Sequence, residues 1–135
     1  MGLDVHFYKV QRVYSPDPRE RYGLEVNQVR VASEILYFRK MWSIVSFFQV
    51  ENCEYYRIEK YILEELLSRC ERIMSGKVDN PESLIPDIGT YIFLDDDKTL
   101  KEQEIEEASI IYDKLHELLV NVNWTTECLY LLADW

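Results

Sequence analysis

Apolar and polar residues along the chain form four short segments with the character of β-strands. These segments are rich in β-branched and aromatic side chains and are bounded by turn-forming or acidic residues; they are residues 3–10 (LDVHFYKV), 54–58 (EYYRI), 90–94 (TYIFL) and 127–133 (ECLYLLA). The last segment is nearly all apolar, which is typical of a strand inside a sheet rather than at its edge.

Between these strands, apolar residues recur at steps of three and four, which predicts three amphipathic helices. We expect the first from about Asn27 to Glu51, with Trp42 on its buried stripe, the second over residues 59–74, and the third from Thr99 to about Asn121. Thr99 and Glu102 fit a capping box at the start of the third helix. Residues 15–23 and 76–89 contain proline and glycine and are predicted to be loops.

The predicted order of elements is β-α-β-α-β-α-β within 135 residues, a length that suits a single domain over residues 1–135. Regular alternation favours a parallel doubly wound sheet. However, the strands are few and short, and no glycine-rich phosphate loop follows the first one. We therefore predict an α+β fold, in which a small mixed or antiparallel sheet of about four short strands packs with three helices.

Composition indicates in which cellular compartment we expect the protein. The cysteines, Cys53, Cys70 and Cys128, are odd in number and form no CxxC pair, so we expect buried thiols in a cytoplasmic protein rather than a disulfide framework. No apolar run approaches the roughly 18 residues of a membrane span. The first residues contain Asp4 and His6 within their apolar run, which is unlike a signal peptide.

Charge is distributed unevenly along the chain, whose net charge is −10. Residues 1–50 carry seven Lys and Arg against five Asp and Glu, whereas residues 51–135 carry eight against twenty. Phosphates repel so acidic a protein, so we expect no direct nucleic-acid binding.

Recognisable catalytic motifs do not occur. The two histidines, His6 and His116, have no accompanying GxSxG, HExxH or Cys/His signature, so we expect no catalytic residues. Aligning Asp95 with the first position of a calcium-binding loop puts Leu100 at the sixth position, where that loop needs glycine. We therefore expect no metal and no cofactor.

Acidic residues crowd the start of the third predicted helix, where residues 95–107 carry a net charge of −5. Negative charge near a helix N-terminus is favourable, so a plain solvated surface explains part of this density. The alternative is a surface that contacts a basic partner, for which we select Asp95, Asp96, Asp97, Glu104 and Glu107.

Ten tyrosines and three tryptophans form a second unusual feature. Such side chains suit interfaces and stack on planar ligands, although most are expected in or beside the core. A ligand site would combine an Arg fork with stacking tyrosines, and its candidates are Tyr37, Arg39, Lys40, Tyr55 and Tyr56. Tyr55 and Tyr56 are neighbours in a strand, so they should point to opposite faces.

Several segments together resemble a family of small uncharacterised proteins encoded by tailed phages, prophages and gut bacteria. They are the opening MGLDVHFYK, the segment YFRK at 37–40, residues 53–74, LIPDIGTYIF at 84–93 and the terminal Trp135. That family opens with MGLDMYL, has a YWRK-type helix motif and closes with an aromatic strand ending in Trp. This chain departs from the pattern, because Phe38, Trp42 and Val45 stand where the family has Trp, Asn and His. The resemblance implies a phage accessory protein with a role in host takeover or counter-defence.

Three functional hypotheses follow from the sequence. The first is a non-enzymatic protein that inhibits or redirects a host protein with a basic surface, such as a nucleic-acid-binding enzyme whose phosphate sites the carboxylates would occupy. The second is a protein that binds a small ligand or nucleotide signal, and the third is an enzyme of unrecognised type. The aromatic surplus is also compatible with a homodimer.

Overall fold

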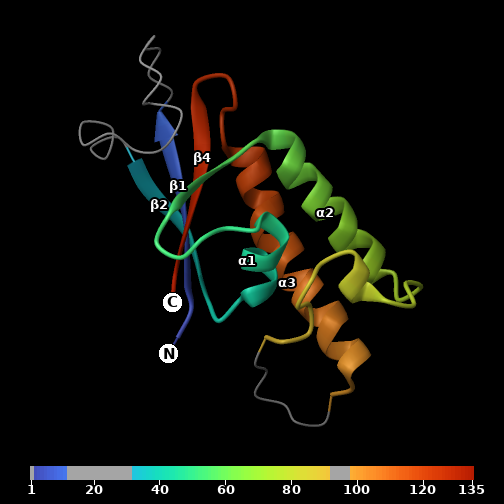
Figure 1. Ribbon diagram of the computed structural model, residues 1–135. Coiled ribbons are helices and arrows are strands. Elements are labelled where there is room, and N and C mark those ends of the chain that lie inside the picture. The colour runs from blue at the N-terminus through green and yellow to red at the C-terminus, as the bar shows by residue number, and fades with distance from the viewer. Residues whose placement is uncertain (1, 12–31, 92–97) are drawn as a thin grey trace.

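The computed structural model describes residues 2–11, 32–91 and 98–135. These residues form four strands, three α-helices and a short 3₁₀-helix at Pro81–Ser83 (Figure 1). The strands and α-helices in chain order are β1 (Asp4–Gln11), β2 (Ala32–Arg39), α1 (Trp42–Phe48), β3 (Tyr55–Ile58), α2 (Lys60–Met74), α3 (Leu100–Asn121) and β4 (Glu127–Asp134).

The strands make one sheet in the order β2-β1-β4-β3, and each neighbouring pair is antiparallel. The α+β class predicted from the sequence is thus confirmed, with the antiparallel alternative for the sheet. The apolar β4 lies in the interior of the sheet between β1 and β3, as its composition predicted.

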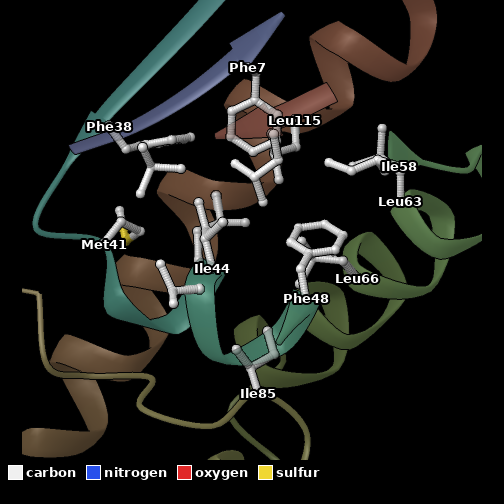
Figure 2. Packing of buried hydrophobic residues seen from close by; sticks show 14 of the residues in the cluster. Phe7, Phe38, Met41, Ile44, Phe48, Ile58, Leu63, Leu66, Ile85 and Leu115 are labelled. Carbon is white, nitrogen blue, oxygen red and sulfur yellow. The ribbon is translucent and has the colours of Figure 1, made fainter. Parts of the chain in front are cut away.

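The helices cover one face of the sheet (Figure 1). Side chains alternate between the two faces of a strand, so every second residue of β1 and β4 points toward the helices. Phe7 and Leu131 take such positions and are fully buried. Figure 2 shows how the core continues from Phe7 into the helical layer, where Ile44 of α1 and Leu115 of α3 pack below its ring.

The prediction of one long helix over residues 27–51 is wrong. Within them, Ala32–Arg39 forms the strand β2 and Trp42–Phe48 forms the short helix α1. Lys40 has φ 61°, a left-handed backbone conformation that no helix can continue through. Trp42 is also more exposed than predicted, at 36% of its surface, and its ring meets Trp135 edge to face at 5.5 Å.

The predictions for the second half of the chain agree well with the structure. The strands β3 and β4 and the helices α2 and α3 begin and end within two residues of their expected bounds. The capping box is present, because Thr99 Oγ1 accepts from Glu102 N at 3.2 Å and Glu102 Oε2 accepts from Thr99 N at 3.3 Å. Of the strand predicted at 90–94, only Thr90 and Tyr91 are described, and neither is in a strand.

Within the described ranges, no helix has the length and apolar character that a membrane crossing requires.

Candidate functional site

The sheet face opposite the helices carries polar and aromatic side chains in ordered rows. Residues paired directly across antiparallel strands point to the same face. One row across the sheet consists of Tyr37, His6, Leu132 and Tyr55, and the next consists of Glu34, Tyr8, Tyr130 and Arg57. Arg39, Asp4 and Asp134 form a third row at the end of the sheet. We call Asp4, His6, Tyr8, Glu34, Tyr37 and Tyr55 together the tyrosine face.

Aromatic rings on this face form a continuous path between the two outer strands. The ring centroids of Tyr37 and His6 are 5.2 Å apart, those of His6 and Tyr8 are 6.2 Å apart, and those of Tyr8 and Tyr55 are 6.0 Å apart. Tyr37 is 46% exposed and Tyr55 40% exposed, so both ends of the path are open to solvent. Such spacing is within the range of favourable aromatic pairs, which gives the rings defined relative positions.

Two carboxylates hold the rings on the β2 side. The Tyr37 hydroxyl donates a hydrogen bond to Asp4 Oδ1, and His6 Nδ1 lies 2.5 Å from Glu34 Oε1. The bond to Asp4, together with desolvation and the negative charges of Asp4 and Glu34, raises the pKa of Tyr37 above its ordinary value. Burial is the main cause that raises the pKa of Tyr8, and electrostatic interactions with Tyr55 and Glu34 raise it further. Both hydroxyl groups are therefore neutral at physiological pH.

A β-bulge places Glu34 on this face. The pairing of β1 with β2 shifts between Phe7 and Tyr8, so that Phe7 pairs with Leu36 but Tyr8 pairs with Glu34. Ile35 is the extra residue, and it packs against the core on the helix side, as Leu36 does. Without the bulge, strict alternation from Tyr37 would direct Ile35 to the tyrosine face and Glu34 toward the core.

Several side chains at the far end of the same sheet face are buried. Val10, Cys128 and Tyr130 are buried there and form a small apolar cluster, with Tyr8 packed against it. The accessible part of the face thus consists of the rows that begin at Tyr37 and Arg39, together with Glu34 and part of Tyr8.

The structure brings together only part of the ligand site proposed from sequence. Tyr37 and Tyr55 share the tyrosine face but lie on the two outer strands, β2 and β3. Tyr56 points the other way and packs on Phe48, with ring centroids 6.0 Å apart, as expected for a neighbour of Tyr55. Arg39 ends β2 and is exposed, and Lys40 is exposed in the link to α1. Asp4, His6, Tyr8 and Glu34 were not among the residues predicted for this site, although Asp4, His6 and Tyr8 alternate in the first strand and therefore share a face.

The acidic surface proposed from sequence is not supported by its described members. Asp95, Asp96 and Asp97 lie outside the described residues, whereas Glu104 is 9% exposed and Glu107 fully buried. The reason is helical geometry: Glu104 and Glu107 precede Ala108 and Ile111 by four residues and share their buried stripe. Neither glutamate is available to a partner, which corrects the prediction for these two positions.

Glu107 instead anchors the loop before α3. Its Oε1 accepts a hydrogen bond from the backbone N–H of Tyr91 at 2.7 Å. Burial raises the pKa of Glu107, while the nearby Ser43 hydroxyl and the backbone N–H groups of Tyr91 and Gly89 partly offset this rise. Ser43 is buried close to the carboxyl, but neither Ser43 Oγ nor Glu107 Oε2 completes a well-aligned hydrogen bond within the described residues.

The cysteines offer weak nucleophiles. Cys70 and Cys128 are buried, as predicted, and burial raises the pKa of Cys70 to about 12. Cys53 is exposed, contrary to the prediction, because it lies in the turn before β3 with φ 61°. A hydrogen bond with Asp134 raises the pKa of Cys53, which keeps its thiol protonated.

The described part of the chain contains no group of three or more His, Cys, Asp or Glu residues arranged to hold a metal ion.

The described elements thus define a four-stranded antiparallel α+β protein with helices on one sheet face and exposed aromatic and acidic side chains on the other. Comparisons of the chain with protein-family models, with curated proteins and with solved structures gave no match. The resemblance to phage-encoded proteins therefore stays a prediction.

Proposed function

We propose that this chain is a non-enzymatic binding protein and that a partner protein docks on the tyrosine face. The observation that carries the proposal is the path of rings from Tyr37 to Tyr55, exposed at both ends and fixed by hydrogen bonds to Asp4 and Glu34. Tyrosines of this kind contribute large contact areas at low entropic cost and are enriched among the residues that dominate binding energy.

Charge indicates the character of the partner. The tyrosine face carries the carboxylates of Asp4 and Glu34, and the chain as a whole has a net charge of −10. The neighbouring rows contain two arginines, Arg39 and Arg57. Arg57 is already paired with Glu59, whose Oε1 lies 3.2 Å from Arg57 Nε. A basic protein surface is complementary to this arrangement, and long-range attraction would accelerate its association. The partner class proposed from sequence is retained, but the site moves from α3 to the sheet.

Affinity capture with matched variants tests the proposal. Tyr37→Ala and Tyr55→Ala remove rings from the tyrosine face, and Tyr61→Ala removes a 70% exposed ring from α2. We expect the two face variants to reduce capture of a host protein about tenfold or more, because truncating a central interface tyrosine has effects of this size. The Tyr61 variant should capture as the unchanged protein does. Equal capture by all three variants would contradict the proposal.

A planar phosphorylated ligand is the second candidate. It is favoured by one observation, the adjacent rings of Tyr37 and His6 with Arg39 at the end of the same strand. The nearby carboxylates of Asp4 and Glu34 would repel its phosphates, which makes a basic protein the better match. Freshly purified protein distinguishes the two, because a retained nucleotide would add absorbance near 260 nm.

A further inference from the structure

We propose that the Glu34 carboxylate, together with the rings of His6, Tyr8 and Tyr37, forms a seat for an arginine side chain of the partner. This inference rests on the proposed function and assigns the chemistry that the tyrosine face recognises. We call these four residues the cation seat.

The position of Glu34 among the rings is the first support. Its Oε1 contacts His6 Nδ1 at 2.5 Å, and its negative charge acts on the hydroxyl groups of both Tyr8 and Tyr37. A carboxylate surrounded by aromatic faces suits a guanidinium, which pairs with the carboxylate through its N–H groups and stacks on the rings through its plane.

The β-bulge at Ile35 is the second support, because it alone gives Glu34 this position. Bulges disrupt the hydrogen bonding of a strand pair, and they are frequent at sheet edges and next to active sites, where they redirect a side chain. Here the bulge directs Ile35 into the core and Glu34 out among the rings. A regular strand would bury Ile35 less well and leave the rings without this carboxylate.

Unused hydrogen-bonding capacity is the third support. The Glu34 side chain is 45% exposed, and within the described residues its Oε2 takes part in no hydrogen bond or ion pair. A guanidinium can therefore donate hydrogen bonds to Glu34 Oε2.

Among the residues that the structure describes, Arg39 and Arg57 are the arginines nearest the cation seat, and both leave it open. Arg39 pairs in register with Asp4, in the row beyond Tyr37, and Arg57 is engaged with Glu59 at the opposite edge of the sheet. Within the described residues, neither arginine forms an ion pair with Glu34, so the charge of this carboxylate is left to attract an external cation.

Binding of short peptides by the whole protein, followed by heteronuclear NMR, tests the inference. One probe alternates glycine and arginine over eight residues, and its control replaces each arginine by citrulline, which has the same shape without the charge. We expect the arginine peptide to shift the resonances of His6, Tyr8 and Glu34, and the citrulline peptide to bind at least about fivefold more weakly. Equal binding of the two peptides would overturn the inference.

Matched variants separate the cation seat from the docking face. Glu34→Gln should weaken the arginine peptide about threefold to fivefold, as expected for an exposed charge pair with aromatic support, while Glu64→Gln on α2 should leave it unchanged. If Glu34→Gln has no effect on the peptide or on capture of the host protein, while Tyr37→Ala abolishes capture, the seat is refuted and the docking face stands. If neither Tyr37→Ala nor Tyr55→Ala changes capture, the proposed function fails as well.

Discussion

Replacing Glu107 by glutamine should remove a defined part of the pH dependence of folding stability. Glu107 is fully buried, and its Oε1 accepts the Tyr91 N–H at 2.7 Å. Burial is the main cause that raises its pKa in the folded protein. Glutamine has nearly the same shape, keeps a carbonyl oxygen for the Tyr91 amide and cannot ionise.

The sign of the effect follows from linkage between protonation and folding. A carboxyl group whose pKa is higher in the folded than in the unfolded chain contributes stability that is fully present below its unfolded pKa of about 4.3. That stability is lost as the pH rises through the folded pKa. The loss is about 1.4 kcal/mol for each unit by which the folded pKa exceeds the unfolded one. The free energy of unfolding of Glu107→Gln, relative to the unchanged protein, should therefore increase between pH 4.3 and neutrality.

Alanine at the same position gives a different expectation. Glu107→Ala also removes the ionisable group, but it leaves the Tyr91 N–H without its acceptor and opens space beside Ser43. An unsatisfied buried amide costs about 1–3 kcal/mol, so this variant should be less stable than Glu107→Gln at every pH.

Urea unfolding at a series of pH values between 4.3 and 8, monitored by tryptophan fluorescence, measures these differences. Glu64→Gln on the exposed side of α2 is the control, because it removes the same charge without a buried environment. Parallel stability curves for Glu107→Gln and the unchanged protein would refute the reasoning.

Three further substitutions test the fold by urea unfolding at neutral pH. Phe7→Ala empties a fully buried site whose ring meets Phe38 at 6.2 Å, and it should lower the free energy of unfolding by about 3–5 kcal/mol; a loss under 1 kcal/mol would contradict the core position. Gly89→Ala should cost about 1–3 kcal/mol, since φ is 88° and the new Cβ would lie 2.8 Å from Glu104 Cγ; an unchanged midpoint would argue against that backbone conformation. Thr99→Ala should cost about 1 kcal/mol through loss of the capping box, and no loss would argue against this cap.

Local signals in the sequence are sufficient for the second half of the chain. The capping box at Thr99 locates the start of α3, and the apolar run at 127–133 identifies the interior strand β4. These features depend on neighbours in the chain, so a single sequence contains the information that determines them.

Residues 32–48 show where local signals fail. Ile35, Phe38, Trp42 and Val45 satisfy helical spacing, yet the first two belong to the strand β2 because pairing with β1 offers more than a local helix would. The bulge at Ile35 disturbs the alternation that would otherwise have indicated a strand. Pairing between residues about thirty positions apart does not appear in any local pattern.

Only part of the candidate site could be predicted from the sequence. Tyr37 and Tyr55 were selected for their chemistry, but the partners that hold the rings come from β1 and from the bulged part of β2. The burial of Glu104 and Glu107 could have been anticipated, because both occupy the stripe that Ala108 and Ile111 define. The high density of negative charge suggested that these two glutamates lie on the surface, whereas their helical spacing indicated that they lie in the core.

Hydroxyl-radical footprinting of the protein, alone and with the partner recovered by affinity capture, tests the central claim most directly. Tyr37, Tyr55 and Tyr61 are 46%, 40% and 70% exposed, so all three should be oxidised in the free protein. A partner on the tyrosine face should protect Tyr37 and Tyr55 and leave the oxidation of Tyr61 on α2 unchanged. Protection of Tyr61 with undiminished oxidation of Tyr37 and Tyr55 would place the partner on the helical side and contradict the account.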